Sequence, residues 1–393
     1  MNRSVAVTGM GILSSIGRNV EENHKSLVHG KHGLSNPTIL ETNHRNLPIG
    51  EIKSSNNDLA EMLNLDKDHA FTRAALLGTL ALKEAVEASG IKDFTNIGFV
   101  NGTSVGGMDM TERFYREYEK DSTNHRFIQA QHPGFTTEKI AAYFGINAYV
   151  TTISTACSSA ANAIMMGARL IRSGRLDKVI VGGTDCLSRF TLNGFNSLKI
   201  YSENFPKPFD KNREGLNLGE AAAYLILESE ASVGDKEILG YVSGYGNAND
   251  AFHQTASSEN GEGAYLAMQK ALKTANLNPH HIEYINAHGT ATLNNDLSES
   301  RALIRTFKEM PAFSSTKSFT GHTLAAAGAI EAVFSLLAIK NQEIYPNLNF
   351  ETQVEDTKLE PVTQLKNANI EHVLSNSFGF GGNCTSLIFS KNG

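Results

Sequence analysis

The sequence predicts an α/β protein, and three observations carry that prediction. Strand-like segments alternate with helix-like segments along all 393 residues. The chain holds 34 glycines but only 9 prolines, which suits many tight strand-to-helix turns. Two pairs of segments also resemble each other: GFVNGTSVGG (98–107) resembles EYINAHGTAT (283–292), and ACSSAANAIMMGARLI (156–171) resembles GHTLAAAGAIEAVFSLLAI (321–339). Two copies of one α/β unit would explain this echo, and so would chance similarity between two strand–helix units.

In the first half of the chain, a strand is expected over residues 4–9 and a helix over 20–28. Residues 71–89 are rich in alanine, leucine and glutamate, so they predict a strong helix. A strand over 96–100 runs into NGTSVGG, which is typical of a turn. The half continues with a helix over 136–143, a strand over 149–155, a helix after Cys157, and strands over 178–181 and 223–228.

The second half repeats this alternation. Strands are expected over 237–242, 282–287, 372–376 and 386–390, and helices over 263–275, 296–308 and 323–339. No low-complexity linker separates the two halves, so they are expected to pack as one body. The predicted division is residues 1–235 and residues 236–393, with the join near Ser232 to Lys236.

The composition restricts the class of protein. Hydrophobic residues make up 40% of the chain and the net charge is −6, which favours a large core and argues against a nucleic-acid partner. The N-terminus MNRSVAVTGMG lacks the apolar stretch of a signal peptide, and no run of 18 apolar residues predicts a membrane span. Cys157, Cys186 and Cys384 show no paired spacing, which fits a reducing cytoplasm.

The segment STACSSAANAI (154–164) places Cys157 where a strand is expected to run into a helix. The first turn of a helix carries a partial positive charge that stabilises a thiolate, so a nucleophilic cysteine is one interpretation. The second interpretation is that Cys157 is a small hydrophobe packed in the core.

Three further segments supply groups that a nucleophile needs. AHGTAT puts His288 at a strand end, KSFTGH holds Lys317 and His322, and SFGFGGN offers glycines whose backbone N–H groups can approach a ligand. Each segment alone is open to a structural interpretation. A zinc site made by the cysteine and two histidines is also conceivable, but no short-spaced ligand pair supports it. Together, and in this order, the segments predict nucleophilic catalysis.

The order TACSS, HGT, KSxTGH and NSFGFGG resembles the β-ketoacyl synthase family of condensing enzymes, and most closely its β-ketoacyl-ACP synthase II type. The likeness covers almost the whole chain, including VAVTGMGILSSIG (5–17), KPFDKNREGLNLGEAAAYLILE (207–228) and LSNSFGFGG (374–382). The resemblance implies the thiolase fold, in which two related α/β halves form five layers, αβαβα. It also implies an acyltransferase of fatty acid or related chain elongation.

The resemblance assigns roles to particular residues. Cys157 would take the acyl group from acyl carrier protein, with its thiolate favoured by the helix N-terminus and a dry pocket. His288 and His322 would hold the malonyl thioester and stabilise the enolate formed on loss of CO2. The backbone N–H groups of Cys157 and Phe380 would form the oxyanion hole, and Phe380 would also be the gate beside the nucleophile.

Further positions match supporting parts of the family's site. Lys317 would fix the hydrogen-bond network, with Asp296 and Glu299 as its charged partners. The expected contacts with substrate are Thr290 and Thr292 to the pantetheine arm, and Val105 and Met108 to the acyl chain.

Acyl carrier protein is the implied partner, and no metal or organic cofactor is expected beyond the phosphopantetheine that its substrates carry. Lys199 matches a basic docking position of the family, and Lys207, Lys211 and Arg213 are nearby candidates. The family is typically dimeric, so a homodimer is expected, and a heterodimer with a paralogue is also possible.

The chain departs from the family pattern at the end of the gating loop. It has GFGGNC where the family usually has GFGGTN, so Cys384 stands where an asparagine is expected. TACSS is also found in polyketide-type synthases. These departures leave open a specialised aryl-polyene or polyketide ketosynthase. A silent chain-length-type subunit and a degradative thiolase are two further interpretations, and the intact Cys157, His288, Lys317 and His322 set argues against both.

Overall fold

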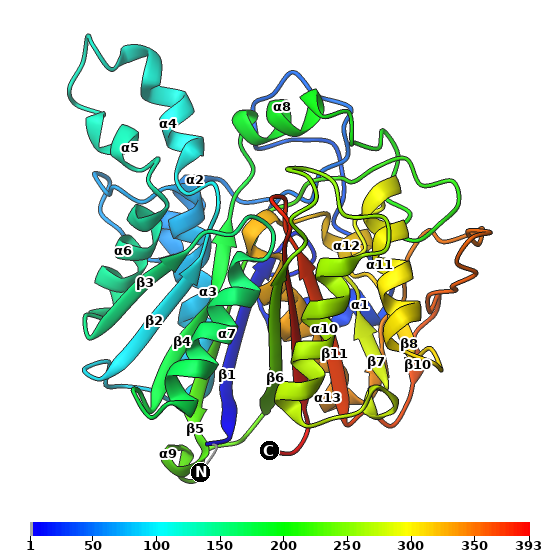
Figure 1. Ribbon diagram of the computed structural model, residues 1–393. Coiled ribbons are helices and arrows are strands. Elements are labelled where there is room, and N and C mark those ends of the chain that lie inside the picture. Colours follow the sequence, from blue (N-terminus) through cyan, green and yellow to red (C-terminus); the bar gives the residue numbers. More distant parts are fainter. Residues whose placement is uncertain (1–2) are drawn as a thin grey trace.

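A computed structural model describes residues 3–393 (Figure 1). Ten of its strands pair in the order β3-β2-β4-β5-β1-β6-β12-β11-β7-β8 within those residues. The strands are β1 Val5–Ser14, β2 Ile97–Gly102, β3 Tyr149–Ile153, β4 Lys178–Asp185, β5 Ala221–Ser229, β6 Gly240–Asn249, β7 Tyr284–Asn286, β8 Ala312–Ser314, β9 Glu343–Ile344, β10 Lys366–Asn367, β11 His372–Phe378 and β12 Asn383–Ser390. β9 and β10 form a separate two-stranded ladder.

The long ladder consists of two five-stranded sheets with the same topology. Outward from the junction the first reads β1-β5-β4-β2-β3, and the second reads β6-β12-β11-β7-β8. In each sheet the three outer strands are parallel, and the next strand inward runs antiparallel to both of its neighbours. Only Ala6 with Tyr241 and Val7 with Gly240 pair across the junction. The two halves are therefore related, as the internal echo predicts.

The helices arrange themselves around these sheets. They are α1 Val20–Val28, α2 Asn56–Met62, α3 Arg73–Ser89, α4 Met108–Phe114, α5 His125–Gln129, α6 Pro133–Phe144, α7 Ser159–Arg172, α8 Arg189–Ser197, α9 Glu230–Val233, α10 Glu262–Ala275, α11 Leu293–Thr306, α12 Lys317–Thr320 and α13 Ala327–Asn341, with 3-10 turns at Tyr115–Glu117, Pro279–His281 and Leu324–Ala326. α3 packs on β1 and β5 with α6 beside it, and α10 packs on β6 and β12 with α11 beside it. α7 and α13 contact each other and strands of both sheets, so they form the middle of five layers, and the predicted thiolase-type architecture is confirmed.

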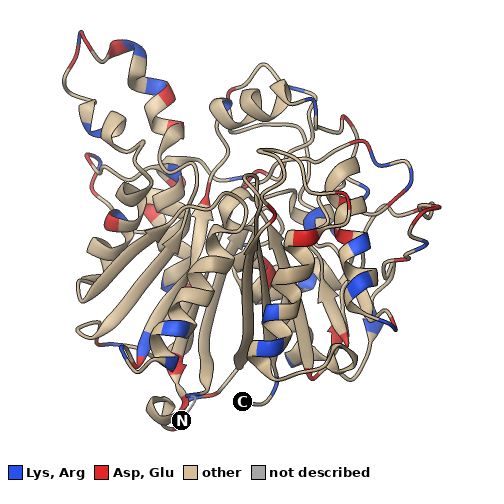
Figure 2. Ribbon diagram, viewed as in Figure 1, with Lys and Arg blue, Asp and Glu red and all other residues tan. Residues whose placement is uncertain are grey.

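Burial follows this layering. The largest hydrophobic cluster surrounds α7 and α13 between the sheets, and two smaller clusters lie under α3 and under α10. Figure 2 shows the strands almost free of charged residues, which lie mainly on the outer helices and the loops. Among residues 3–393, one segment, Leu324–Asn341, is long and apolar enough to cross a membrane, and 89% of it is buried inside the molecule. The segment includes α13, and its apolar character is explained by burial in the middle layer of the fold.

Most expected elements are present, with shifted ends. The helix over 20–28 has the expected bounds, whereas β1, β6 and β12 are longer than expected because they are buried over most of their length. Four short helices outside the layers, α2, α4, α5 and α8, were not predicted from the sequence. The division at residue 235 stays a prediction.

Candidate active site

Cys157 sits in a strained turn between β3 and α7. Ala156 before it has φ +52°, in the left-handed region that alanine rarely adopts. Two serine hydroxyls hold the turn: Ser158 Oγ lies 2.8 Å from the Thr155 carbonyl oxygen, and Ser159 Oγ donates to the Ala156 carbonyl oxygen at 2.6 Å. Cys157 is 6% exposed. A strand, a strained residue and a helix start thus present this side chain at a fixed place.

The expectation that this cysteine is a ready thiolate is wrong. Burial raises the pKa of Cys157 to about 11, although a hydrogen bond from the Phe380 backbone N–H and the charge of Lys317 lower it. A dry pocket disfavours the charged form, and α7 begins only at Ser159, so the helix terminus does not offset the lost hydration. At neutral pH the resting group is a thiol.

His288 and His322 face each other. Their ring centroids lie 5.5 Å apart at an interplanar angle of 89°, and each residue is 2% exposed. Burial, followed by the charge of Lys317, lowers the pKa of His288 well below its usual value and that of His322 to about 3. Both rings are therefore neutral at physiological pH. His322 Nδ1 accepts the Leu324 N–H at 3.0 Å, so its proton resides on Nε2.

Lys317 begins α12, and its Nζ forms a buried ion pair with Glu331 of α13. The prediction that Asp296 and Glu299 pair with this lysine is wrong, because both carboxylates bind backbone N–H groups instead. Glu331 was not predicted from the sequence. It is the one acidic residue of α13, within an otherwise apolar stretch, and that isolation was the available signal.

Asp296 and Glu299, both on α11, hold the AHGTAT loop. Glu299 accepts the N–H groups of His288 at 2.9 Å and Gly289 at 2.8 Å, and Asp296 accepts that of Thr290 at 3.0 Å. Burial raises the pKa of Glu299 to about 7, against the lowering effect of these hydrogen bonds. The two carboxylates therefore position His288 through its backbone.

The four candidate segments meet in one cavity of about 230 Å³. Its lining includes Cys157, His288, His322, Phe380, Thr290, Thr292, Lys199 and Cys384. Thr290 and Thr292 are linked through their hydroxyls at 2.8 Å. Cys384 is buried opposite Ala248 of β6, and burial raises the pKa of its thiol. Among residues 3–393, no group of three His, Cys, Asp or Glu side chains is arranged to hold a metal ion.

A second, apolar cavity of about 280 Å³ also reaches Cys157. Its lining residues are Ser104, Val105, Ala156, Phe190, Thr191, Gly194, Phe195, Leu198, Leu324 and Phe380. Met108 begins α4 and is not part of this lining.

Asp185 at the end of β4 shapes the wall of this apolar cavity. It accepts the backbone N–H groups of Ser104 and Val105 at 3.2 Å and that of Ala325 at 3.0 Å. Asp185 was not predicted from the sequence, although a carboxylate after VGGT in a buried strand was a signal for it.

The basic docking candidates differ in accessibility. Lys199 is exposed at the rim of the Cys157 cavity. Lys207 pairs with Glu351 at 3.0 Å, and Lys211 pairs with Glu355 at 2.6 Å. Arg213 is buried and donates to the Leu293 carbonyl oxygen at 2.8 Å, so it is not available to a partner.

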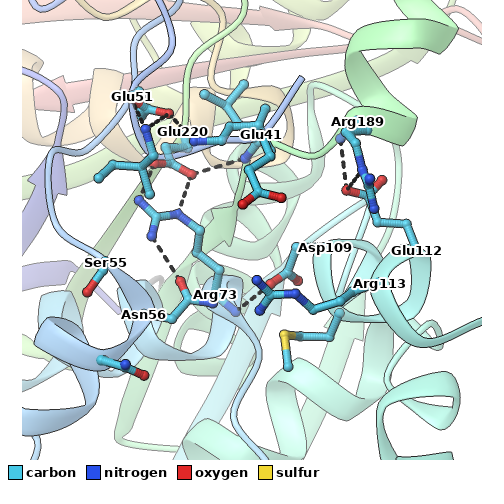
Figure 3. Close-up of a pocket in the computed structure, with 15 residues that line it drawn as sticks. Glu41, Glu51, Ser55, Asn56, Arg73, Asp109, Glu112, Arg113, Arg189 and Glu220 are labelled. Atoms are coloured by element: carbon cyan, nitrogen blue, oxygen red, sulfur yellow. Dashed lines mark hydrogen bonds and ion pairs between the residues drawn. The ribbon is translucent and has the colours of Figure 1, made fainter. Parts of the chain in front are cut away.

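A separate cavity of about 260 Å³ lies beside α2 and α4 and is lined by charged residues (Figure 3). Arg73 binds Glu220 through both Nε and Nη2, at 2.8 and 2.6 Å, and donates its other hydrogens to Asn56 and two backbone carbonyls. Burial raises the pKa of nearby Asp109 to about 6. Because all five N–H groups of Arg73 are hydrogen bonded, the Arg73–Glu220 pair joins segments of the fold. The Ser55 hydroxyl in the lining accepts the Asp58 N–H as the N-cap of α2.

Comparisons with known proteins agree with this geometry. Residues 2–232 match the family described as "Beta-ketoacyl synthase, N-terminal domain", and residues 239–351 match "Beta-ketoacyl synthase, C-terminal domain". The chain is 33% identical over 415 residues to 3-oxoacyl-[acyl-carrier-protein] synthase 2 of Staphylococcus aureus strain N315, covering 99% of each. It is 31% identical over 412 residues to the Vibrio harveyi protein of the same name, again covering 99% of each.

Solved structures are similar over the whole chain. The ishigamide ketosynthase/chain length factor matches with TM-score 0.93 and 29% identity, covering 100% of both chains. A structure of the ketosynthase ApeO in complex with its chain length factor ApeC, from Xenorhabdus doucetiae, matches with TM-score 0.86 and 31% identity, covering 99% of this chain and 98% of that one. AntDE:AntF, a type II acyl carrier protein in complex with its ketosynthase, matches with TM-score 0.87 and 26% identity, covering 99% and 100%.

Proposed function

Because this chain belongs to the β-ketoacyl synthase family, we propose that it joins an acyl group carried on Cys157 to malonyl-ACP, with loss of CO2, to give 3-oxoacyl-ACP. The enzyme is an acyltransferase. The observation that carries the proposal is the meeting of Cys157, His288 and His322 in one buried cavity. A thiol nucleophile and two neutral hydrogen-bond donors are what this condensation needs.

In the first step the Cys157 sulfur attacks the acyl thioester of the carrier protein. The negative charge that develops on the carbonyl oxygen is stabilised by the N–H groups of Cys157 and Phe380. The pantetheine sulfur leaves and the acyl group stays on Cys157. Since the resting group is a thiol with a raised pKa, its proton is lost as the C–S bond forms and ends on the departing pantetheine sulfur.

In the second step malonyl-ACP replaces the first carrier protein. His288 and His322 donate hydrogen bonds to its thioester oxygen, and His322 does so through Nε2–H. Loss of CO2 leaves an enolate on that oxygen, and its carbon attacks the acyl-Cys157 carbonyl. The bond between the acyl carbon and Cys157 Sγ breaks, 3-oxoacyl-ACP leaves, and the Cys157 thiolate takes up one proton from solvent. Burial, followed by the charge of Lys317, lowers the pKa of both histidines and keeps them neutral.

The remaining predicted residues take supporting parts in this proposal. Thr290 and Thr292 contact the pantetheine arm, Val105 helps to define the space for the acyl chain, and Lys199 meets the acidic carrier protein at the rim. Met108, which lies outside the lining of the apolar cavity, takes no part in the isolated protomer. Support for Val105 comes from its place in the apolar cavity that reaches Cys157, and support for Lys199 comes from its exposure.

A second candidate function is the same chemistry on aryl, polyene or polyketide chains. Two similar structures are described as containing a ketosynthase and a chain length factor, which favours this candidate. The same observation makes a heterodimer with a paralogue an alternative to the homodimer that we propose. β3 is the end strand of the ladder and offers one unpaired edge for either partner. Sedimentation of the purified chain, alone and with candidate paralogues, separates the two assemblies.

The decisive experiment measures the intact mass of the protein after incubation with saturated, aryl and polyene acyl-ACPs. We expect one acyl adduct on the wild type and none on Cys157→Ala, and the chains that load identify the substrate class. If the folded protein forms no adduct with any of these chains, the result would contradict a stand-alone enzyme and favour a silent chain-length-type subunit.

A further inference from the structure

The two N–H donors proposed for the oxyanion hole come from separate parts of the chain. Cys157 belongs to the turn before α7, and Phe380 belongs to the loop between β11 and β12. A pair of donors stabilises a developing charge only when both are held at the required positions. The two segments therefore need a fixed connection.

The backbone of the loop is tied by backbone–backbone hydrogen bonds to residues 250–254 and not to the turn that carries Cys157: the Gly381 N–H donates to the Gln254 carbonyl oxygen at 2.7 Å, and the Gly382 carbonyl oxygen accepts the Asp250 N–H at 2.7 Å. Gly381 and Gly382 both have φ +85°, and a Cβ at Gly381 would meet no atom of residues 3–393 within 4 Å. The Phe380 ring stacks on Phe195 with centroids 5.8 Å apart, but that contact is to α8 and not to the turn that carries Cys157.

Asn383, three residues after Phe380, makes the connection. Its Oδ1 lies 2.8 Å from Asn162 Nδ2 and 2.8 Å from Ser158 Oγ, both at the start of α7, and 2.9 Å from Asn247 Nδ2 of β6. Its carbonyl oxygen accepts the Gly379 N–H at 2.8 Å, which closes the loop on itself.

Asn162 completes the link to the nucleophile. Its Nδ2 also donates to Thr155 Oγ1 at 2.9 Å, two residues before Cys157, and its Oδ1 accepts from Thr385 Oγ1 at 2.8 Å. Asn162 is 6% exposed and Ser158 is fully buried. Losing the shared acceptor therefore deprives one Asn162 N–H of its close partner in the interior, whereas Ser158 Oγ keeps the Thr155 carbonyl oxygen at 2.8 Å.

We propose that Asn383 is a positioning residue that aligns the Phe380 N–H with the Cys157 N–H, acting through Asn162 and Ser158. This inference rests on the proposed function. It implies that Asn383 governs the two steps that pass through a tetrahedral centre on Cys157. Decarboxylation of malonyl-ACP uses His288 and His322 instead, so it does not depend on Asn383.

The test compares two variants of matched size. Asn383→Leu removes the acceptor, and Asn383→Asp keeps an oxygen that can accept the same hydrogen bonds. Two reactions are followed: single-turnover acylation of Cys157 by acyl-ACP, and release of CO2 from malonyl-ACP. For Asn383→Leu we expect the maximal acylation rate to fall about tenfold or more. The acyl-ACP concentration that gives half the maximal rate, and the rate of CO2 release, should both stay within about threefold of wild type. Asn383→Asp recovers most of the lost rate.

A double-mutant cycle locates the effect. Asn162→Leu should slow acylation like Asn383→Leu, and the double variant should be little slower than either, because both changes remove one connection. Asn247→Leu is the control, since β6 carries neither N–H donor, and it should keep acylation within about threefold of wild type.

Acylation by Asn383→Leu within about twofold of wild type would overturn the proposal. An equal loss of acylation, decarboxylation and melting temperature, without recovery in Asn383→Asp, would also overturn it, because that pattern reports general destabilisation. A wild type that neither acylates nor decarboxylates contradicts the proposed function itself, and the inference that rests on it falls too.

Discussion

Cys157 is buried enough to rest as a thiol, and its neighbours only partly counter that burial. The hydrogen bond from Phe380 and the charge of Lys317 favour the thiolate, but loss of hydration outweighs them and raises the pKa to about 11. In the proposed mechanism the thiol proton is therefore lost as the C–S bond forms, and not in the resting enzyme. A resting thiol also reacts slowly with oxidants and small electrophiles at neutral pH.

The raised pKa predicts how Cys157 reacts with iodoacetamide. Since only the thiolate is alkylated, the rate should rise about tenfold per pH unit from pH 7 to 10. Mass spectrometry of the alkylated peptide gives the rate, and Cys157→Ala gives the background from Cys186 and Cys384, which are both buried. A rate that levels off below pH 8 would show that the thiol has an ordinary or lowered pKa.

The Lys317–Glu331 pair is the second residue-scale feature with a measurable consequence. Both side chains are almost fully buried, at 3% and 1% exposure. Removing one partner leaves the other without compensation, so Lys317→Met should lower the free energy of unfolding by about 3 kcal/mol. The double variant Lys317→Met/Glu331→Leu should recover much of that loss. Urea denaturation checks both, and equal losses in the two variants would contradict the pairing.

At the scale of elements, the middle layer depends on the close approach of α7 and α13. A Cβ added at Gly328 of α13 would lie 2.8 Å from both Cβ and N of Ala161. The backbone of α7 cannot move away because sheets cover it on both sides. Gly328→Ala should therefore lower the free energy of unfolding by about 1–3 kcal/mol.

Gly194 of α8 is the matched control. A Cβ there would meet no atom of the described residues within 4 Å, and its φ is not positive. Gly194→Ala should raise the stability by up to about 1 kcal/mol, because alanine favours a helix. Denaturant titration of the two variants distinguishes crowding from propensity, and a stabilised Gly328→Ala would contradict the close packing.

The apolar cavity predicts a change in the acyl chains that load. Val105 lines it and Met108 does not. Val105→Phe should fill part of the space and slow acylation by the longest accepted chain about tenfold while sparing short chains. Met108→Ala should leave the profile of chain lengths unchanged in the isolated protomer. Competition between acyl-ACPs of different length, read by intact mass, measures this, and a shift caused by Met108→Ala alone would show that the cavity extends toward α4.

At the scale of the whole molecule, buried titrating groups make stability depend on pH. The folded-state pKa of His322 is lowered to about 3 from 6.5, so its contribution is complete above pH 6.5 and is lost as the pH falls from 6.5 toward 3. Glu299 and Glu331, raised to about 7 from 4.5, act in the opposite sense, because their contribution is lost as the pH rises from 4.5 to 7. Below pH 4.5 the two glutamates no longer offset the stability that is lost through His322.

The free energy of unfolding should therefore fall steadily below pH 4.5. His322→Asn should reduce that slope by up to about 1.4 kcal/mol per pH unit, since one proton fewer is taken up on unfolding. A residual slope should persist in His322→Asn, because Glu51 also has a lowered pKa in the folded protein. Burial raises the pKa of Glu51, but hydrogen bonds from Lys53 and from residues 38–40 outweigh burial and lower that pKa to about 2. Urea titrations between pH 3 and 4.5 measure both slopes, and identical slopes would contradict a buried neutral His322.

Much of the architecture could be predicted from local pattern. Periodicity located the long helices α3, α7, α10 and α13, and the echo between residues 98–107 and 283–292 corresponds to β2 and β7, which hold equivalent places in the two sheets. The short helices α4 and α8 were missed because Met108–Phe114 and Arg189–Ser197 have little buried apolar surface to produce a pattern. Their order depends on the segments they pack against.

The sequence by itself determined which side chains are available for chemistry, because Cys157, His288, Lys317 and His322 stand in motifs whose order is specific to a family. Only the tertiary structure decided the protonation states of these side chains and the residues that they pair with. Burial made Cys157 a thiol, packing between helices paired Lys317 with Glu331 instead of Asp296 or Glu299, and the meeting of two halves brought Asn383 onto Asn162. Desolvation and distance are properties of packed segments far apart in the chain, so no local pattern encodes them.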